Sequence, residues 1–122
     1  MDAQMKRGFL DACVLATMTN RESYGYQIIK DLPKMLEISE STLYPILKRL
    51  EAKKFIQVRK AEYNGRLRKY YSLTPLGHAE LVNFVADKQD VLNIFHFIEE
   101  SIDEAASLIP HNESLITSGV QQ

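Results

Sequence analysis

The side chains best suited to chemistry in this sequence are cations and tyrosines gathered in its first two thirds. Residues 48–70 contain nine lysines and arginines against two acids, Glu51 and Glu62, which gives a local charge of +7. All six tyrosines also lie within residues 1–77. A localised positive field of this kind attracts an anionic partner, with phosphate as the natural candidate. The alternative is a basic face that simply remains in solvent, and charge alone leaves both open.

The total charge conceals this asymmetry. Residues 1–77 carry a balance of +6 and residues 78–122 a balance of −7, so that the whole chain has a net charge of −1. The pI of about 6.3 is lower than the value usual for a nucleic-acid-binding domain. Whether the positive region binds an anion therefore depends on the helices and strands that position its side chains.

The sequence lacks the motifs of enzymes and of metal sites. Its glycines, at positions 8, 25, 65, 77 and 119, form no phosphate-binding loop, dinucleotide fingerprint or nucleophile elbow. His78, His96 and His111 have neither the spacing of a metal site nor a second cysteine nearby. We therefore expect no catalytic residues, no metal and no cofactor.

Length and cysteine content indicate one domain in a reducing compartment. A chain of 122 residues supports one modest core, and no apolar run approaches the ~18 residues that span a membrane. Asp2 and Asp11 argue against a secretory signal. Cys13 is the only cysteine, so no internal disulfide forms, and we expect it to be a core residue of a cytoplasmic protein.

The segment 39–53 predicts the most informative helix. Leu43, Ile46, Leu47 and Leu50 fall on one apolar stripe. The opposite side presents a set of polar and aromatic residues: Ser41, Tyr44, Pro45, Lys48 and Ala52, with Thr42 and Arg49 at its edge. Since Pro45 removes a backbone hydrogen bond, we expect the first turn to be irregular.

Apolar and polar residues alternate in segments 55–63 and 66–73, as they do in β-strands. The two segments flank Asn64-Gly65, the strongest short hairpin signal. The register that a two-residue turn sets is Tyr63 with Arg66, Lys60 with Lys69, Val58 with Tyr71, and Ile56 with Leu73. The two lysines then lie directly opposite each other, which is mildly unfavourable unless an anion meets the hairpin tip.

Three further helices are expected. Residues 5–18 and 24–32 read as helices, the second with Ser23 as its cap, and residues 35–38 as a short strand. Residues 76–109 read as one long helix that begins after Thr74-Pro75 and ends at Pro110. Its apolar stripe is too long for this small domain to cover, which predicts a homodimer, the alternative being a helix that folds back on its own domain.

Three helices followed by a two-stranded hairpin is the order of a winged helix-turn-helix, in which the third helix enters the major groove of DNA. The fold class is therefore α+β, mostly α: a winged helix-turn-helix with a two-stranded wing and a long C-terminal dimerisation helix. We expect a DNA-binding domain over 1–74, the dimerisation helix over 75–110 and a disordered tail over 111–122.

The sequence resembles the PadR family of bacterial transcriptional regulators over roughly residues 5–80. The resemblance rests on residues 23–29 (SYGYQII), 41–51 (STLYPILKRLE) and 68–77 (RKYYSLTPLG). The tail resembles the short subfamily, whose single C-terminal helix makes the dimer. The resemblance implies a dimeric regulator, usually a repressor, that binds double-stranded DNA at palindromic operators near its own or neighbouring genes.

The resemblance also implies the functional residues. Those expected to bind DNA are Ser41, Thr42, Tyr44, Lys48 and Arg49 on the third helix, Asn64, Gly65, Arg66, Arg68 and Lys69 on the wing, and Tyr24 and Lys6 beside it. Packing of Tyr24 inside the domain is an equal alternative. The expected dimer interface comprises Leu81, Val85, Leu92, Phe95, Ile98 and Ile102.

Some relatives release DNA when a planar aromatic compound binds between the long helices, beside a tryptophan. This chain has no tryptophan, and Phe84 and Lys88 fall near that region. A small aromatic effector at these two residues is a hypothesis, with ordinary core packing as the alternative. Two other functions remain open: a winged-helix protein-interaction module that no longer binds DNA, and a small-molecule carrier or enzyme in the dimer groove.

Overall fold

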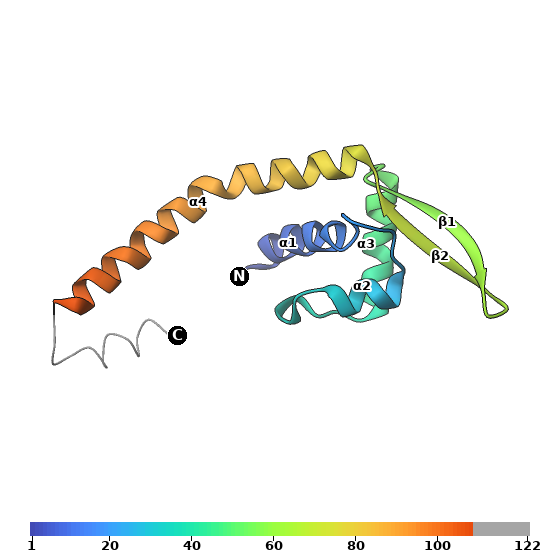
Figure 1. The fold of residues 1–122 in the computed structure, drawn as a ribbon, viewed down its shortest axis with the longest axis horizontal. Coiled ribbons are helices and arrows are strands. Elements are labelled where there is room, and N and C mark those ends of the chain that lie inside the picture. The colour runs from blue at the N-terminus through green and yellow to red at the C-terminus, as the bar shows by residue number, and fades with distance from the viewer. Residues whose placement is uncertain (109–122) are drawn as a thin grey trace. The chain divides into compact units, whose positions relative to one another are not determined.

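The computed structural model describes residues 1–108, and these form the predicted α-helices and hairpin in the predicted order (Figure 1). The elements are α1 (Ala3–Ala16), α2 (Gly25–Asp31), a 3-10 helix η1 (Lys34–Leu36), α3 (Glu40–Ala52), β1 (Ile56–Tyr63), β2 (Arg66–Leu73) and α4 (Pro75–Ser107). The chain divides into one compact unit that ends at Phe84 and a second that begins at Val85. The expected tail, 111–122, and the expected helix end at Pro110 lie outside the described residues.

The core of the first unit is built from the apolar stripes of its helices. Leu43, Ile46, Leu47 and Leu50 are all buried, as the period of α3 predicts. The other core residues are Leu10, Val14, Leu15, Met18, Ile28, Leu32, Leu36, Ile56 and Tyr71. Burying this stripe fixes the orientation of α3 and leaves its polar side exposed.

Polar side chains at the predicted boundaries begin two of the helices. The Ser39 hydroxyl accepts a hydrogen bond from the backbone N–H of Thr42 at 3.3 Å, which caps α3. The Thr74 hydroxyl accepts one from the N–H of Gly77 at 3.0 Å, and Pro75 takes the first position of α4 as expected.

The hairpin has the predicted register, with Tyr63 opposite Arg66 and Lys60 opposite Lys69. Asn64 and Gly65 both have positive φ, 51° and 79°, which a two-residue turn of this kind requires. Ser23 adds a bridge at the base of the hairpin, where its backbone exchanges two hydrogen bonds with Tyr71. This bridge ties the wing to the loop before α2.

Three local expectations are wrong. Residues 35–38 do not form a strand, because the backbone turns after Pro33 into the 3-10 helix η1. Ser23 does not cap α2, because the bridge to β2 uses its backbone, and α2 begins after Tyr24 without a side-chain cap. The first turn of α3 is regular. Pro45 lies on the exposed side of the helix, and its missing N–H removes only one backbone hydrogen bond.

The start of α4 packs closely on the first unit. Gly77 is buried, and a Cβ built on it would lie 2.1 Å from the carbonyl oxygen of Phe55. Leu81 packs against the core of the same unit, and the ring centre of Phe84 lies 5.2 Å from that of Phe9, nearly perpendicular to it. The first ten residues of α4 are thus part of the winged domain.

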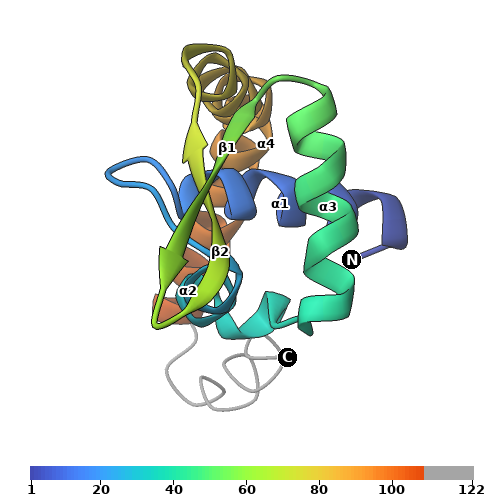
Figure 2. The ribbon, with the colours of Figure 1, turned by 90° about the vertical axis from the view of Figure 1, so that its right-hand side faces the viewer.

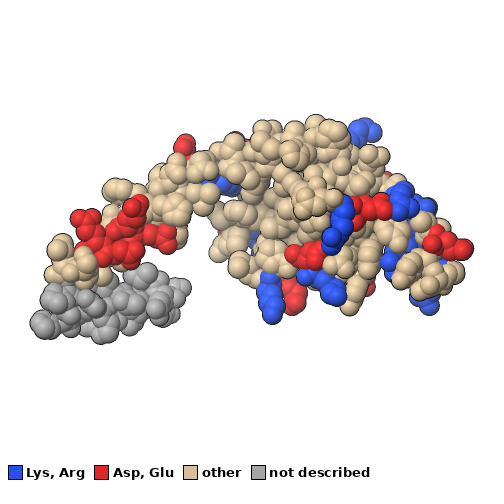
Figure 3. Space-filling view, viewed as in Figure 1, with Lys and Arg blue, Asp and Glu red and all other residues tan. Residues whose placement is uncertain are grey.

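The second unit, as far as it is described, is the remainder of α4. Large apolar side chains on it are exposed: Val85, Val91, Leu92, Ile94, Phe95, Phe97 and Ile98. Its residues 85–108 carry six acids and one cation, and Figure 3 shows acidic side chains gathered on this unit. Over the described residues, no helix has the length and hydropathy needed to cross a membrane.

Candidate nucleic-acid interface

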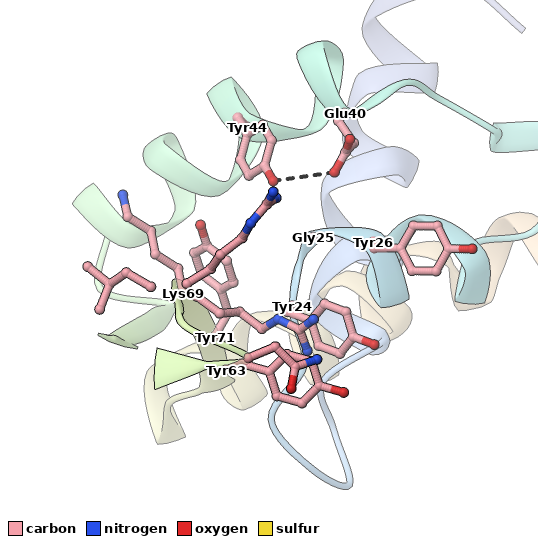
Figure 4. A pocket seen from close by; sticks show the side chains of 12 residues that line it. Tyr24, Gly25, Tyr26, Glu40, Tyr44, Tyr63, Lys69 and Tyr71 are labelled. Carbon is pink, nitrogen blue, oxygen red and sulfur yellow. Dashed lines mark hydrogen bonds between the residues drawn. The ribbon is translucent and has the colours of Figure 1, made fainter. Parts of the chain in front are cut away.

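An open groove of about 890 Å³ lies in the first unit, between α3, the start of α2 and the hairpin (Figure 4). Tyr44 and Glu40 line it from α3, and Tyr24, Gly25 and Tyr26 from the start of α2. The hairpin contributes Tyr63, Asn64, Arg66, Leu67, Arg68, Lys69 and Tyr71. The groove combines tyrosine rings with cations, a combination suited to a phosphate backbone.

The exposed side of α3 continues this surface, and Figure 2 views the first unit from the side that carries both α3 and the hairpin. Ser41, Thr42 and Lys48 are exposed there, beside Tyr44. The hydroxyl of Ser39 lies 2.9 Å from that of Ser41 and 3.2 Å from that of Thr42. Burial of the opposite stripe therefore leaves a row of hydroxyls and one cation for a partner.

Arg49 lies at the edge of this side and has a partner of its own. Its Nη2 donates to Asp11 Oδ1 on α1 at 2.6 Å, and both side chains are partly buried. The pair connects α3 to α1. Arg49 is therefore held by the protein, whereas Lys48 one residue before it is exposed.

Arg68 is enclosed by tyrosines. Its guanidinium carbon lies 4.0 Å from the ring centre of Tyr63 and 4.1 Å from that of Tyr24, with the Tyr70 ring at 5.8 Å. These distances are those of cation–π contacts. The rings restrain the guanidinium while its charge remains beside the groove. Tyr24 is half-buried in this stack, so its ring packs within the domain.

A second arginine of the wing is neutralised within the domain. Arg59 Nε donates to Glu22 Oε2 at 2.8 Å, and its Nη2 forms a salt bridge with the same carboxylate. This hydrogen bond is the main reason that the pKa of Glu22 is lowered, so the pair stays charged at neutral pH. Arg59 also lies 4.6 Å from the Tyr70 ring. The loop before α2 is thereby attached to β1.

Tyr44 is fixed between α2 and the first turn of its own helix. A Cβ on Gly25 would lie 2.8 Å from the Tyr44 hydroxyl, so a larger residue there would displace this ring from its position. The hydroxyl donates to Glu40 Oε1 at 3.4 Å, as the dashed line in Figure 4 marks. Burial and the Glu40 carboxylate both raise the pKa of Tyr44, so the hydroxyl remains a donor at neutral pH.

The predicted DNA-binding residues therefore fall into groups. One groove is lined by Tyr24, Tyr44, Asn64, Arg66, Arg68 and Lys69. Ser41, Thr42 and Lys48 are exposed on α3, Gly65 is exposed in the turn, Arg49 is paired with Asp11, and Lys6 is exposed on α1.

Sequence reasoning missed Glu40, Tyr26 and Tyr63 as groove residues. The spacing of Glu40 and Tyr44, one helical turn apart, was the available signal for the first of them.

Little in the described residues suggests other chemistry. Within residues 1–108, no group of three potential ligands is arranged to hold a metal ion. Burial raises the pKa of the Cys13 thiol, which keeps it protonated and unreactive at neutral pH. The first unit has a second, smaller pocket of about 120 Å³ beside Phe84, between α1, the end of α3 and the start of α4.

Known proteins share this sequence and fold. The model of the transcriptional regulator PadR-like family matches residues 14–83. An uncharacterized protein of Lysinibacillus sphaericus is 32% identical over 102 residues, covering 80% of this chain and 94% of that protein.

Solved structures agree with the family model. A PadR-like transcription factor from Bacteroides fragilis is 31% identical with a TM-score of 0.69, over 79% of this chain and 95% of that one. A PadR-like transcriptional regulator from Bacillus cereus is 29% identical with a TM-score of 0.67, over 79% of this chain and 96% of that one. The family model spans more than half of this chain, which belongs to the PadR-like family and is a winged-helix transcriptional regulator, not an enzyme.

Proposed function

We propose that this regulator is a dimeric repressor that binds a palindromic operator near its own or neighbouring genes. The observation that carries the proposal is the groove in which Tyr44 of α3 meets Arg66, Arg68 and Lys69 of the wing. A recognition helix reads base edges in the major groove, and a basic wing holds the phosphates beside it. The exposed hydroxyls of Ser41 and Thr42 extend the reading surface.

The DNA contacts divide by chemistry. Ser41, Thr42 and Tyr44 carry hydroxyls that suit base edges, whereas Lys48 and the wing cations suit phosphates. Asn64 and Gly65 form the turn that brings the backbone near the DNA. Lys6 of α1 and Arg49 lie at the outer edge of the surface. To bind a phosphate, the Arg49 guanidinium must either leave the Asp11 carboxylate or contact both groups at once.

The dimer would form through α4. Val85, Leu92, Phe95 and Ile98 are exposed on the part of α4 that lies in the second unit, and Ile102 there is half-buried. Apolar side chains in this number on one helix favour burial against a second copy. Leu81 also packs on its own domain, so its contribution to the interface is the smallest of the set. A twofold dimer presents two recognition helices to two half-sites about 34–36 Å apart, or a multiple of this spacing.

Release from DNA would be caused by a small aromatic effector. The pocket beside Phe84 has a volume of about 120 Å³, and Leu15, Leu50, Phe55 and Leu81 supply apolar walls. Lys53 and Glu80 also line it, so an effector there would combine a small apolar group with a polar one. Asp11 also lines the pocket and holds Arg49 of α3, so a ligand there would act on the recognition helix. Lys88 lies outside the first unit and remains a candidate from its place in the sequence.

The full-length protein should be tested by selecting duplexes from a random library. Enrichment of a palindrome is expected, with log K falling linearly against log salt by about 0.9 for each phosphate neutralised. Replacing Arg66 and Lys69 together by alanine should reduce that slope by about two units. A folded protein that enriches no sequence and binds no duplex even at low salt would contradict the proposal and favour the protein-interaction module.

A further inference from the structure

Glu40 is an acid in a groove whose other charged lining residues are cations. It occupies the first position of α3 and lines the groove together with Arg66, Arg68 and Lys69. Among the described residues it nevertheless forms no salt bridge, and its carboxylate accepts a hydrogen bond from the Tyr44 hydroxyl instead. A carboxylate in this place stabilises the N-terminus of α3, but it also works against general attraction to phosphate.

We propose that Glu40 is a specificity-determining residue that accepts a hydrogen bond from the N4 amino group of a cytosine in the operator. The first residues of a recognition helix are those that meet base edges in the major groove. In that groove cytosine presents an amino donor, whereas guanine and thymine present acceptors that repel a carboxylate. Adenine also offers an amino group, but its neighbouring N7 acceptor opposes the second carboxylate oxygen.

Tyr44 is the positioning residue for this carboxylate. Its ring lies close over Gly25, where a Cβ would come within 2.8 Å of the hydroxyl, and this contact sets the hydroxyl beside Glu40. The hydroxyl engages one carboxylate oxygen, Oε1, and leaves Oε2 for the base. The negative charge of Glu40 then has a second effect. On a DNA sequence without the cytosine amino group at this position, the carboxylate lies unpaired near the phosphates and opposes binding.

This inference rests on the proposed function, since it assigns a base to a recognition helix that binds DNA. The experiment uses the operator recovered from the random library and a series of operators with one base pair changed at a time. Wild type, Glu40→Gln and Tyr44→Phe are compared, with Glu51→Gln as the control. Glu51 is exposed on the same helix but does not line the groove, and Glu51→Gln removes the same charge as Glu40→Gln.

Wild type should lose about tenfold in affinity when one particular C·G pair of each half-site is changed, in line with the discrimination of a good base contact. Glu40→Gln should remove most of that preference and bind random duplex more tightly, with an unchanged thermal midpoint. Tyr44→Phe should weaken the same preference at the same base pair, and Glu51→Gln should keep it.

Three results separate the possibilities. If Glu40→Gln and Tyr44→Phe keep the wild-type preference at every base pair, the inference is overturned while the proposed function stands. If Glu51→Gln loses the preference as well, the effect is one of net charge, and the inference is again overturned. If the wild-type protein selects no sequence, the proposed function fails and the inference falls with it.

Discussion

The guanidinium carbon of Arg68 lies 4.0 Å from the ring centre of Tyr63, on the opposite strand of the wing. Tyr24, from the loop before α2, lies at almost the same distance, 4.1 Å, so the cation has an aromatic ring from each of two segments. Each such contact at a partly exposed site contributes about 0.5–1 kcal/mol. The wing is thereby attached to the helical part of the domain through the same cation that faces the groove.

Arg68→Ala should weaken binding to all duplexes similarly and reduce the slope of log K against log salt by about one unit. Arg68→Lys should keep the slope, because the charge remains, and lose only the planar stacking on the tyrosines. Fluorescence anisotropy at several salt concentrations measures both. A slope that Arg68→Ala leaves unchanged would remove this part of the wing from the interface.

Thr42→Ala should reduce the ratio of the affinity for the operator to the affinity for random duplex by about fivefold, because the hydroxyl is expected to contact a base edge. Thr42→Ser retains the hydroxyl and should keep the wild-type affinity ratio. Competition binding with both duplexes gives the ratio directly. Equal ratios for the alanine and serine variants, both near wild type, would count against base readout at this position.

Gly77→Ala should destabilise the first unit by about 1–3 kcal/mol, because the added Cβ would lie 2.1 Å from the Phe55 carbonyl oxygen and must displace backbone. His78→Ala, at the exposed neighbouring position, should change the free energy of unfolding by less than about 0.5 kcal/mol. Urea unfolding followed by circular dichroism compares the two. A Gly77→Ala protein as stable as wild type would show that α4 does not need this close approach.

Ser23→Ala should leave the protein equally stable or make it more stable by about 1 kcal/mol. The Ser23 side chain is buried, and within the described part of the chain its hydroxyl has no hydrogen-bond partner. Its backbone bonds to Tyr71 do not depend on the side chain. Ser72→Ala, at a half-buried position of β2, is the comparison. A loss of 1 kcal/mol or more for Ser23→Ala would reveal a partner for the hydroxyl, such as a bound water.

Phe95→Glu should convert the dimer to a monomer, because the 55% exposed ring is expected to be buried by the second copy. Gln89→Glu adds the same charge at a polar position of the same helix and should leave the dimer intact. Sedimentation velocity distinguishes the 14.0 kDa chain from twice that mass. A wild-type protein that is monomeric at micromolar concentration would contradict the assignment of this face.

Much of the fold follows from local patterns. The hairpin register is set by Asn64 and Gly65, whose positive φ leaves one way to pair the strands. The buried side of α3 follows from its helical period. The strand expected at residues 35–38 was wrong, because a run of three apolar residues and one acid carries no signal that separates an extended segment from a 3-10 turn.

The site was less accessible to sequence reasoning, because its side chains find partners far along the chain. The stack of Arg68 on Tyr24 and the salt bridge of Arg49 with Asp11 join segments 44 and 38 residues apart. No local spacing encodes such pairs, so nothing in the sequence separates Arg49 from Lys48 or from the wing cations. The structure separates them: Lys48, Arg66 and Lys69 are exposed, whereas Arg49 and Arg59 are held by acids.

The central claim, that this protein recognises an operator through α3 and the wing, is tested most directly by gel shift. The full-length protein is added to the DNA upstream of its own gene at two salt concentrations, with a random duplex as competitor. The account predicts retardation that survives the competitor and weakens as salt rises. No retardation at low salt, from a protein shown to be folded and dimeric, would contradict it.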